Sequence, residues 1–171
     1  MAAGTHPVTG PWRGVGRWAG LALALLVTVP GVLRPLSGSL LSTVNLVFHE
    51  AGHVVFGLFG ETVMLLGGSV MQVLVPLGCA AAFLARRDRY AAGIVTLWAA
   101  HSLASVAAYI RDAPTRNLDL ITGDPDTHDW WQLLGAADAL HLAAPLGSAV
   151  AFLAFVAIVA GVLLAVWDEL T

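Results

Sequence analysis

Two histidines and a glutamate, spaced as a metal site requires, lie inside an otherwise apolar stretch of the sequence. The stretch reads NLVFHEAGHVVFGLFGE from Asn45 to Glu61 and contains His49, Glu50 and His53 in the pattern H-E-x-x-H. On a helix the two histidines lie one turn apart, and Glu50 lies about 100° round from His49. Such histidines bind Zn²⁺, which acidifies a water molecule, and the glutamate takes its proton. The pattern therefore predicts a zinc-dependent hydrolase of the metalloprotease type.

The composition indicates a membrane protein. Of the 171 residues, 58% are hydrophobic and only 11% are charged, and the mean hydropathy is +0.80. Soluble domains carry about 25% charged residues. The formal net charge of −3 gives no basic surface for nucleic acid, so we expect no nucleic-acid partner.

The apolar stretches predict an all-α, polytopic membrane bundle, because about 20 apolar residues cross a bilayer. Residues 1–17 are expected to form an N-terminal tail, and residues 18–171 a single integral-membrane domain. We expect five spans in the lipid bilayer, at about 18–36, 40–60, 62–85, 90–111 and 143–167. The polar segment 112–142 is expected to hold an interfacial helix, begun by an Asp-Pro turn and capped by Thr127.

Three of the predicted spans each carry a stripe of polar or small residues on one helical face. Lipid does not tolerate such stripes, so we expect them to face one another. The stripes are Asn45, His49, Gly52 and His53 on the second span, Gly68, Gln72, Val75 and Cys79 on the third, and His101, Ser105, Ala108 and Asp112 on the fourth.

A zinc site of this type needs a third protein ligand, and two residues compete for that role. Asp112 ends the stripe of the fourth span, and His128 precedes the predicted interfacial helix. Sites with two histidines and a carboxylate, and sites with three histidines, both occur. Asp129 is expected to orient a ligand, and Gln72 to lie near the metal. His101 is expected to form hydrogen bonds between helices.

The segment FHEAGHVVFGLFG resembles the active-site helix of the site-2 protease family of intramembrane zinc metalloproteases. GGSVMQVLVPL, from Gly67 to Leu77, is similar to the Gly-Pro/Ser-x-x-Asn element of the next span in that family. The resemblance implies Zn²⁺, membrane-protein substrates and, for a short bacterial relative, the cytoplasmic membrane. The family's third ligand is an Asp in a Leu-Asp-Gly or Asn-Pro-Asp-Gly motif. This chain lacks that motif and offers YIRDA and GDPDTHDW instead.

A non-catalytic membrane protein is the alternative interpretation. In one version, the metal site only stabilises the packing of the helices. In the other, His49 and His101 bind a b-type haem from facing spans. Glu50 distinguishes the hydrolase from these non-catalytic alternatives. Zinc-dependent hydrolysis uses a carboxylate beside the metal, whereas a haem site or a purely structural metal site does not.

Overall fold

The computed structural model describes residues 12–35 and 38–170, and this part of the chain is helical, without strands. The N-terminal boundary differs from the prediction, because residues 12–17 of the expected tail belong to the first helix; residues 1–11 lie outside the described residues. The helices are α1 Trp12–Leu33, α2 Leu40–Phe56, α3 Glu61–Ala85, α4 Arg89–Asp112, α5 Asp129–Ala136 and α6 Ala143–Leu170, and the 3₁₀ turns are Gly57–Phe59, Pro125–Thr127 and Leu140–Leu142.

Four stretches of the described chain are long and apolar enough to cross a membrane. They lie in α1, α3, α4 and the region Leu140–Trp167, which includes α6. They correspond closely to four of the predicted spans. The second predicted span corresponds to α2, which is not among these four stretches; with 17 residues it lies at the lower end of the lengths that cross a bilayer, so a crossing there stays a prediction.

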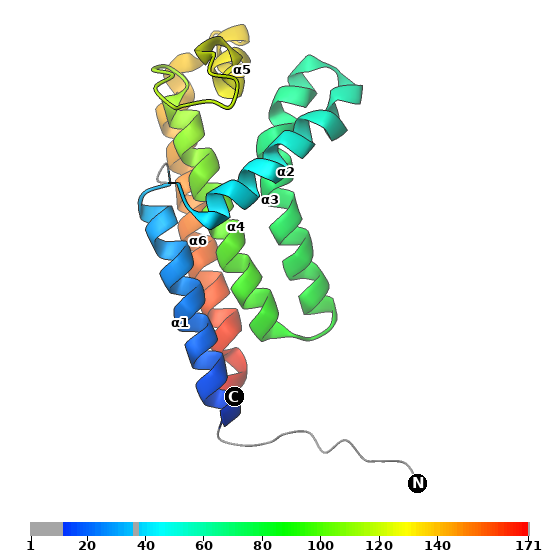
Figure 1. The fold of residues 1–171 in the computed structure, drawn as a ribbon, viewed down its shortest axis with the longest axis vertical. Helices are drawn as coiled ribbons and strands as arrows, with labels where there is room; N and C mark the ends of the chain where they lie inside the picture. Colours follow the sequence, from blue (N-terminus) through cyan, green and yellow to red (C-terminus); the bar gives the residue numbers. More distant parts are fainter. Residues whose placement is uncertain (1–11, 36–37, 171) are drawn as a thin grey trace.

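Helix α4 is the central element of the bundle (Figure 1). It packs against α6, α3 and α1, and its apolar window is the most buried of the four. Small residues bring α4 and α6 close together. A Cβ atom added at Gly93 would lie 2.5 Å from the carbonyl oxygen of Gly161, so the helix backbones meet directly at this point.

Helix α2 runs obliquely across this bundle and leads into α3 (Figure 1). Its N-terminus is capped by the Ser39 hydroxyl, which accepts a hydrogen bond from the backbone N–H of Ser42. At the crossing with α3, a Cβ atom on Gly52 would lie 2.2 Å from the carbonyl oxygen of Gly67. The chain then reverses at Gly60, whose φ of 96° favours glycine. These glycines set α2 tightly against α3.

The segment between α4 and α6 returns over one end of the bundle and carries α5. The predicted Asp-Pro turn is present, since the Asp124 side chain caps the turn Pro125–Thr127. The predicted cap of the following helix is wrong. His128, not Thr127, caps α5, because its Nδ1 atom accepts the backbone N–H of Trp131 at 3.2 Å. Arg116 braces the segment through an ion pair with Asp126 and by lying over the Trp131 ring.

Candidate metal centre

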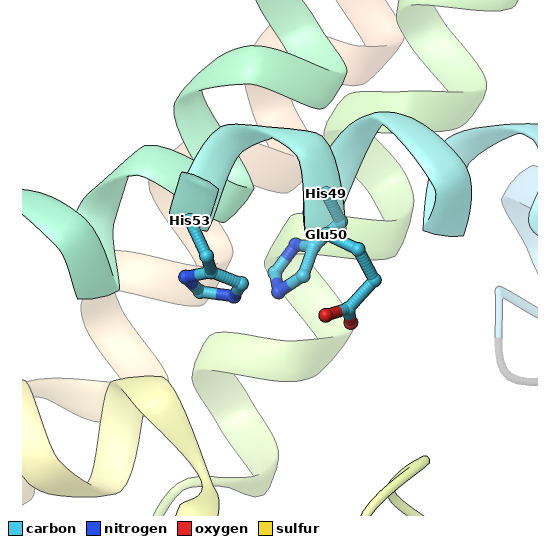
Figure 2. A group of neighbouring side chains, drawn as sticks. All are labelled: His49, Glu50 and His53. Carbon is cyan, nitrogen blue, oxygen red and sulfur yellow. The ribbon is translucent and has the colours of Figure 1, made fainter. Parts of the chain in front are cut away.

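The side chains of His49, Glu50 and His53 lie together on one side of α2 (Figure 2). One ligand atom from each lies within 4.8 Å of the others. His49 is buried, His53 is half-buried and Glu50 is exposed. The helical spacing predicted from the sequence thus produces a compact group of potential ligands, and this group could bind a metal ion.

Hydrogen bonds fix the orientation of both imidazole rings. His49 Nδ1 lies 3.1 Å from Gln72 Oε1, and the Gln72 amide is itself held because its Nε2 donates to the Ser102 carbonyl oxygen at 3.2 Å. His53 Nδ1 lies 2.9 Å from the carbonyl oxygen of Met64. Because both partners are acceptors, these contacts favour the tautomer that carries the proton on Nδ1. In that tautomer each Nε2 has the lone pair with which a histidine binds a metal ion.

Asp129, the first residue of α5, meets these two nitrogen atoms. Its Oδ2 atom lies 2.9 Å from His49 Nε2 and 3.4 Å from His53 Nε2. Burial acts to raise the pKa of the Asp129 carboxyl, but its contacts with the histidines outweigh burial and lower the pKa. A carboxylate and two nitrogen lone pairs converge on one point. They repel one another unless a cation, either a metal ion or a proton, lies between them.

Gly68 of α3 lets both imidazole rings lie close to the backbone of that helix. A Cβ atom added at this position would lie 2.7 Å from His49 Nε2, 2.7 Å from His53 Nε2 and 2.8 Å from His49 Cε1. Real Cβ contacts are not this short, so only glycine permits both rings in these positions. The donor set fits a bound metal ion.

Asn45 holds α2 to α4 through a buried polar network. Its Oδ1 atom accepts hydrogen bonds from Trp98 Nε1 at 2.8 Å and from Ser102 Oγ at 3.0 Å. Its Nδ2 atom donates to His101 Nδ1 at 3.0 Å. The fully buried His101 therefore forms hydrogen bonds between helices, as expected from the sequence. Its Nε2 atom lies 3.5 Å from Ser39 Oγ, so both ring nitrogens have partners other than His49.

Replacement of Asn45 by Ala is expected to destabilise the fold by about 1–3 kcal/mol, the usual cost of leaving buried polar groups unsatisfied. Trp98, Ser102 and His101 would each lose a partner. The measurement is thermal unfolding in detergent. Asn117→Ala is the matched control, because Asn117 is exposed. Equal melting temperatures for the two variants would show that the network contributes nothing to stability.

The two residues expected to compete as third ligand lie beside one another. Asp112 Oδ2 is 3.5 Å from His128 Nε2. The Asp112 carboxylate also accepts the backbone N–H groups of Asn117 and Leu118, both at 3.0 Å, and so shapes the turn that follows α4. His128 is fully buried, and burial lowers its pKa. Among the described residues, the carboxylate that contacts both His49 and His53 is Asp129, which the sequence suggested only as a supporting residue.

The histidines and Glu50 line a cleft of ≈ 460 Å³ between α2, α4 and the segment 118–122. Its wall combines apolar side chains such as Leu46 and Val106 with polar ones such as Ser105 and Gln132. The potential ligands therefore lie at the wall of a cleft of mixed polarity.

Two contributors to the site were not recognised from the sequence. Tyr109 lines the cleft, and its hydroxyl oxygen accepts the backbone N–H of Asp129 at 3.1 Å. Its place one turn beyond Ser105 on the polar stripe of α4 was the available signal. The carbonyl oxygen of Met64 had no such signal, because any residue can offer a carbonyl group.

Comparisons with known proteins identify no relative of this chain. No family model, no curated protein and no solved structure matches it.

Proposed function

We propose that this protein is a zinc-dependent metalloprotease that hydrolyses peptide bonds of membrane proteins. The observation that carries the proposal is the convergence of His49 Nε2, His53 Nε2 and Asp129 Oδ2 on one point, with Glu50 beside it. Two histidines and one carboxylate are the protein ligands of a common class of catalytic zinc site, which keeps its fourth position open.

The spacing of these atoms supports zinc. Bonds of about 2.0–2.1 Å at tetrahedral angles separate ligand atoms by about 3.3 Å. The distances of 2.9 Å and 3.4 Å from Asp129 Oδ2 to the two nitrogens lie near this value. When bound, zinc supplies a Lewis acid that polarises a carbonyl group and makes a water molecule a good nucleophile near neutral pH.

Residues of the chain transfer the proton and orient the histidines. Glu50 is not needed as a ligand in this scheme, and its exposed carboxylate lines the cleft. It takes a proton from the attacking water and returns it to the leaving amine. Gln72 and the Met64 carbonyl keep His49 and His53 in the tautomer that binds metal.

The apolar helices support a substrate that also lies in or near a membrane. In this proposal the oblique α2 lies within the bilayer beside the four longer spans, as a fifth intramembrane helix, and α5 lies at the interface. A helical substrate segment must unwind locally before hydrolysis, because its backbone amides are otherwise hydrogen-bonded. The proposed setting is the bacterial cytoplasmic membrane, as the resemblance to site-2 proteases implies.

Metal analysis of purified protein tests this site. Wild type is expected to hold about one zinc ion per chain. Asp129→Ala should weaken zinc binding by more than the about 10–100-fold that follows the loss of a supporting partner. Asp112→Ala and His128→Ala should have smaller effects, because neither residue contacts the histidine pair. Zinc content near zero in wild type, in protein purified without chelator, would refute the proposal. A larger loss in either of the other two variants would reassign the third ligand.

A further inference from the structure

Tyr109 joins the candidate third ligand to the central helix of the bundle. It lies on α4, and its hydroxyl oxygen accepts the backbone N–H of Asp129 at 3.1 Å. Its ring stands edge-on to His49, with centroids 5.7 Å apart, and lies against His128 at 4.1 Å. A single side chain of α4 therefore contacts one metal-binding histidine, Asp129 and the cap of α5.

The position of Asp129 depends on a small number of contacts. It begins α5, a helix of only eight residues that follows the irregular segment 113–128. An isolated helix of this length is not stable in water, so its place is set by tertiary contacts. The N–H of a first helical residue also has no partner within its helix. Tyr109 provides that partner, and it lies on α4, the central helix that packs against α6, α3 and α1.

The direction of this hydrogen bond determines what Tyr109 can do. The backbone N–H of Asp129 donates to the phenol oxygen, so the contact fixes the main chain from which the carboxylate extends. The carboxylate is left free to face His49 Nε2 and His53 Nε2. His128 fixes the next turn, since it accepts the N–H of Trp131. Trp130 adds a contact with α3, because its Nε1 atom donates to Ser69 Oγ at 3.0 Å. Of these contacts, the one from Tyr109 is made to Asp129 itself.

We propose that Tyr109 is a positioning residue, which holds Asp129 against the two histidines and so preorganises the metal centre. The inference rests on the proposed metal site, in which Asp129 is a ligand. Supporting partners of metal ligands typically contribute 10–100-fold to metal affinity. Loss of the phenol oxygen should therefore weaken metal binding even though the aromatic ring, and its packing on His49 and His128, is retained.

The test compares the only two tyrosines in the chain, both on α4. Tyr90 has an equivalent hydrogen bond, donated to the Arg17 carbonyl oxygen at 2.9 Å, on a part of α4 away from the site. Zinc affinity of the full-length protein is measured by competition with a chromophoric chelator. Tyr109→Phe should bind zinc about 10–100-fold more weakly than wild type, and Tyr90→Phe should match wild type.

Two further readouts separate positioning from general destabilisation. In cobalt-substituted protein, the visible bands report the geometry around the metal. Tyr109→Phe should shift them and Tyr90→Phe should not, whereas simple loss of folded protein would only lower their intensity. In an Asp129→Ala background, Tyr109→Phe should have no further effect on zinc affinity, because Tyr109 acts through Asp129.

The outcomes distinguish this inference from the proposed function. If wild type binds no zinc, the metal site itself is refuted. If wild type binds zinc, and Tyr109→Phe matches Tyr90→Phe in zinc affinity and cobalt spectrum, Tyr109 does not position Asp129. The inference is also overturned if Tyr109→Phe weakens zinc binding equally with and without Asp129.

Discussion

Replacement of Glu50 by Gln is expected to reduce peptide hydrolysis by about 10²–10⁴-fold, the usual contribution of general-base catalysis. Gln has nearly the size of Glu and still forms hydrogen bonds, but it does not accept a proton from water. The metal should stay bound, because His49, His53 and Asp129 remain in place. The expected result is therefore loss of turnover without loss of zinc.

The measurement is cleavage of a candidate membrane protein co-expressed with wild type or variant, with zinc content determined in parallel. Glu61→Gln is the matched control, because Glu61 is an exposed residue in the first turn of α3 and does not line the cleft. It should cleave like wild type. If Glu50→Gln cleaves equally well, the protein does not use metalloprotease chemistry of the H-E-x-x-H type. If Glu50→Gln loses zinc or unfolds, Glu50 has a structural role, and this result would support the interpretation as a non-catalytic membrane protein.

Replacement of Gly68 by Ala is expected to abolish metal binding while leaving α3 intact. The added methyl group would lie 2.7 Å from both Nε2 atoms and 2.8 Å from His49 Cε1, so the two imidazole rings would have to move away from the positions in which they converge. Ala itself favours a helix over Gly by up to about 1 kcal/mol, so loss of the metal cannot be attributed to a weaker helix. This variant still contains His49, His53, Asp129 and Glu50.

Gly78 on the same helix provides the matched control. A Cβ atom at Gly78 would meet nothing within 4 Å, so Gly78→Ala should keep its zinc. Elemental analysis of both variants, with circular dichroism to check helix content, makes the comparison. Zinc retained by Gly68→Ala at the wild-type level would mean that metal binding does not depend on the positions of these two imidazole rings.

Local sequence patterns predicted much of this architecture. Apolar stretches gave the ends of α3, α4 and α6 closely, since these helices are long and bounded by polar turns. Helical spacing also predicted that His49 and His53 would point to a common site and that Gln72 would reach it. In each case the relevant residues lie on one helix or on two helices joined by a short turn.

The carboxylate that contacts both histidines could not be predicted in the same way. Asp129 lies 80 residues beyond His49, and its position depends on how the segment after α4 folds back. Asp112 was a reasonable candidate because it ends the polar stripe, but its carboxylate binds backbone N–H groups of the following turn. The number of spans stays a prediction at α2, because a helix of 17 residues lies at the lower end of the lengths that cross a bilayer.

The separation of 80 residues between His49 and Asp129 has a consequence for folding. A metal ion held by both would close a long loop of the chain as a reversible cross-link, and only the native fold brings its ends together. By mass action, each tenfold rise in free metal above the dissociation constant would then add about 1.4 kcal/mol to the free energy of unfolding. The free energy needed for local opening of α5 would therefore rise with the concentration of free metal in the cell.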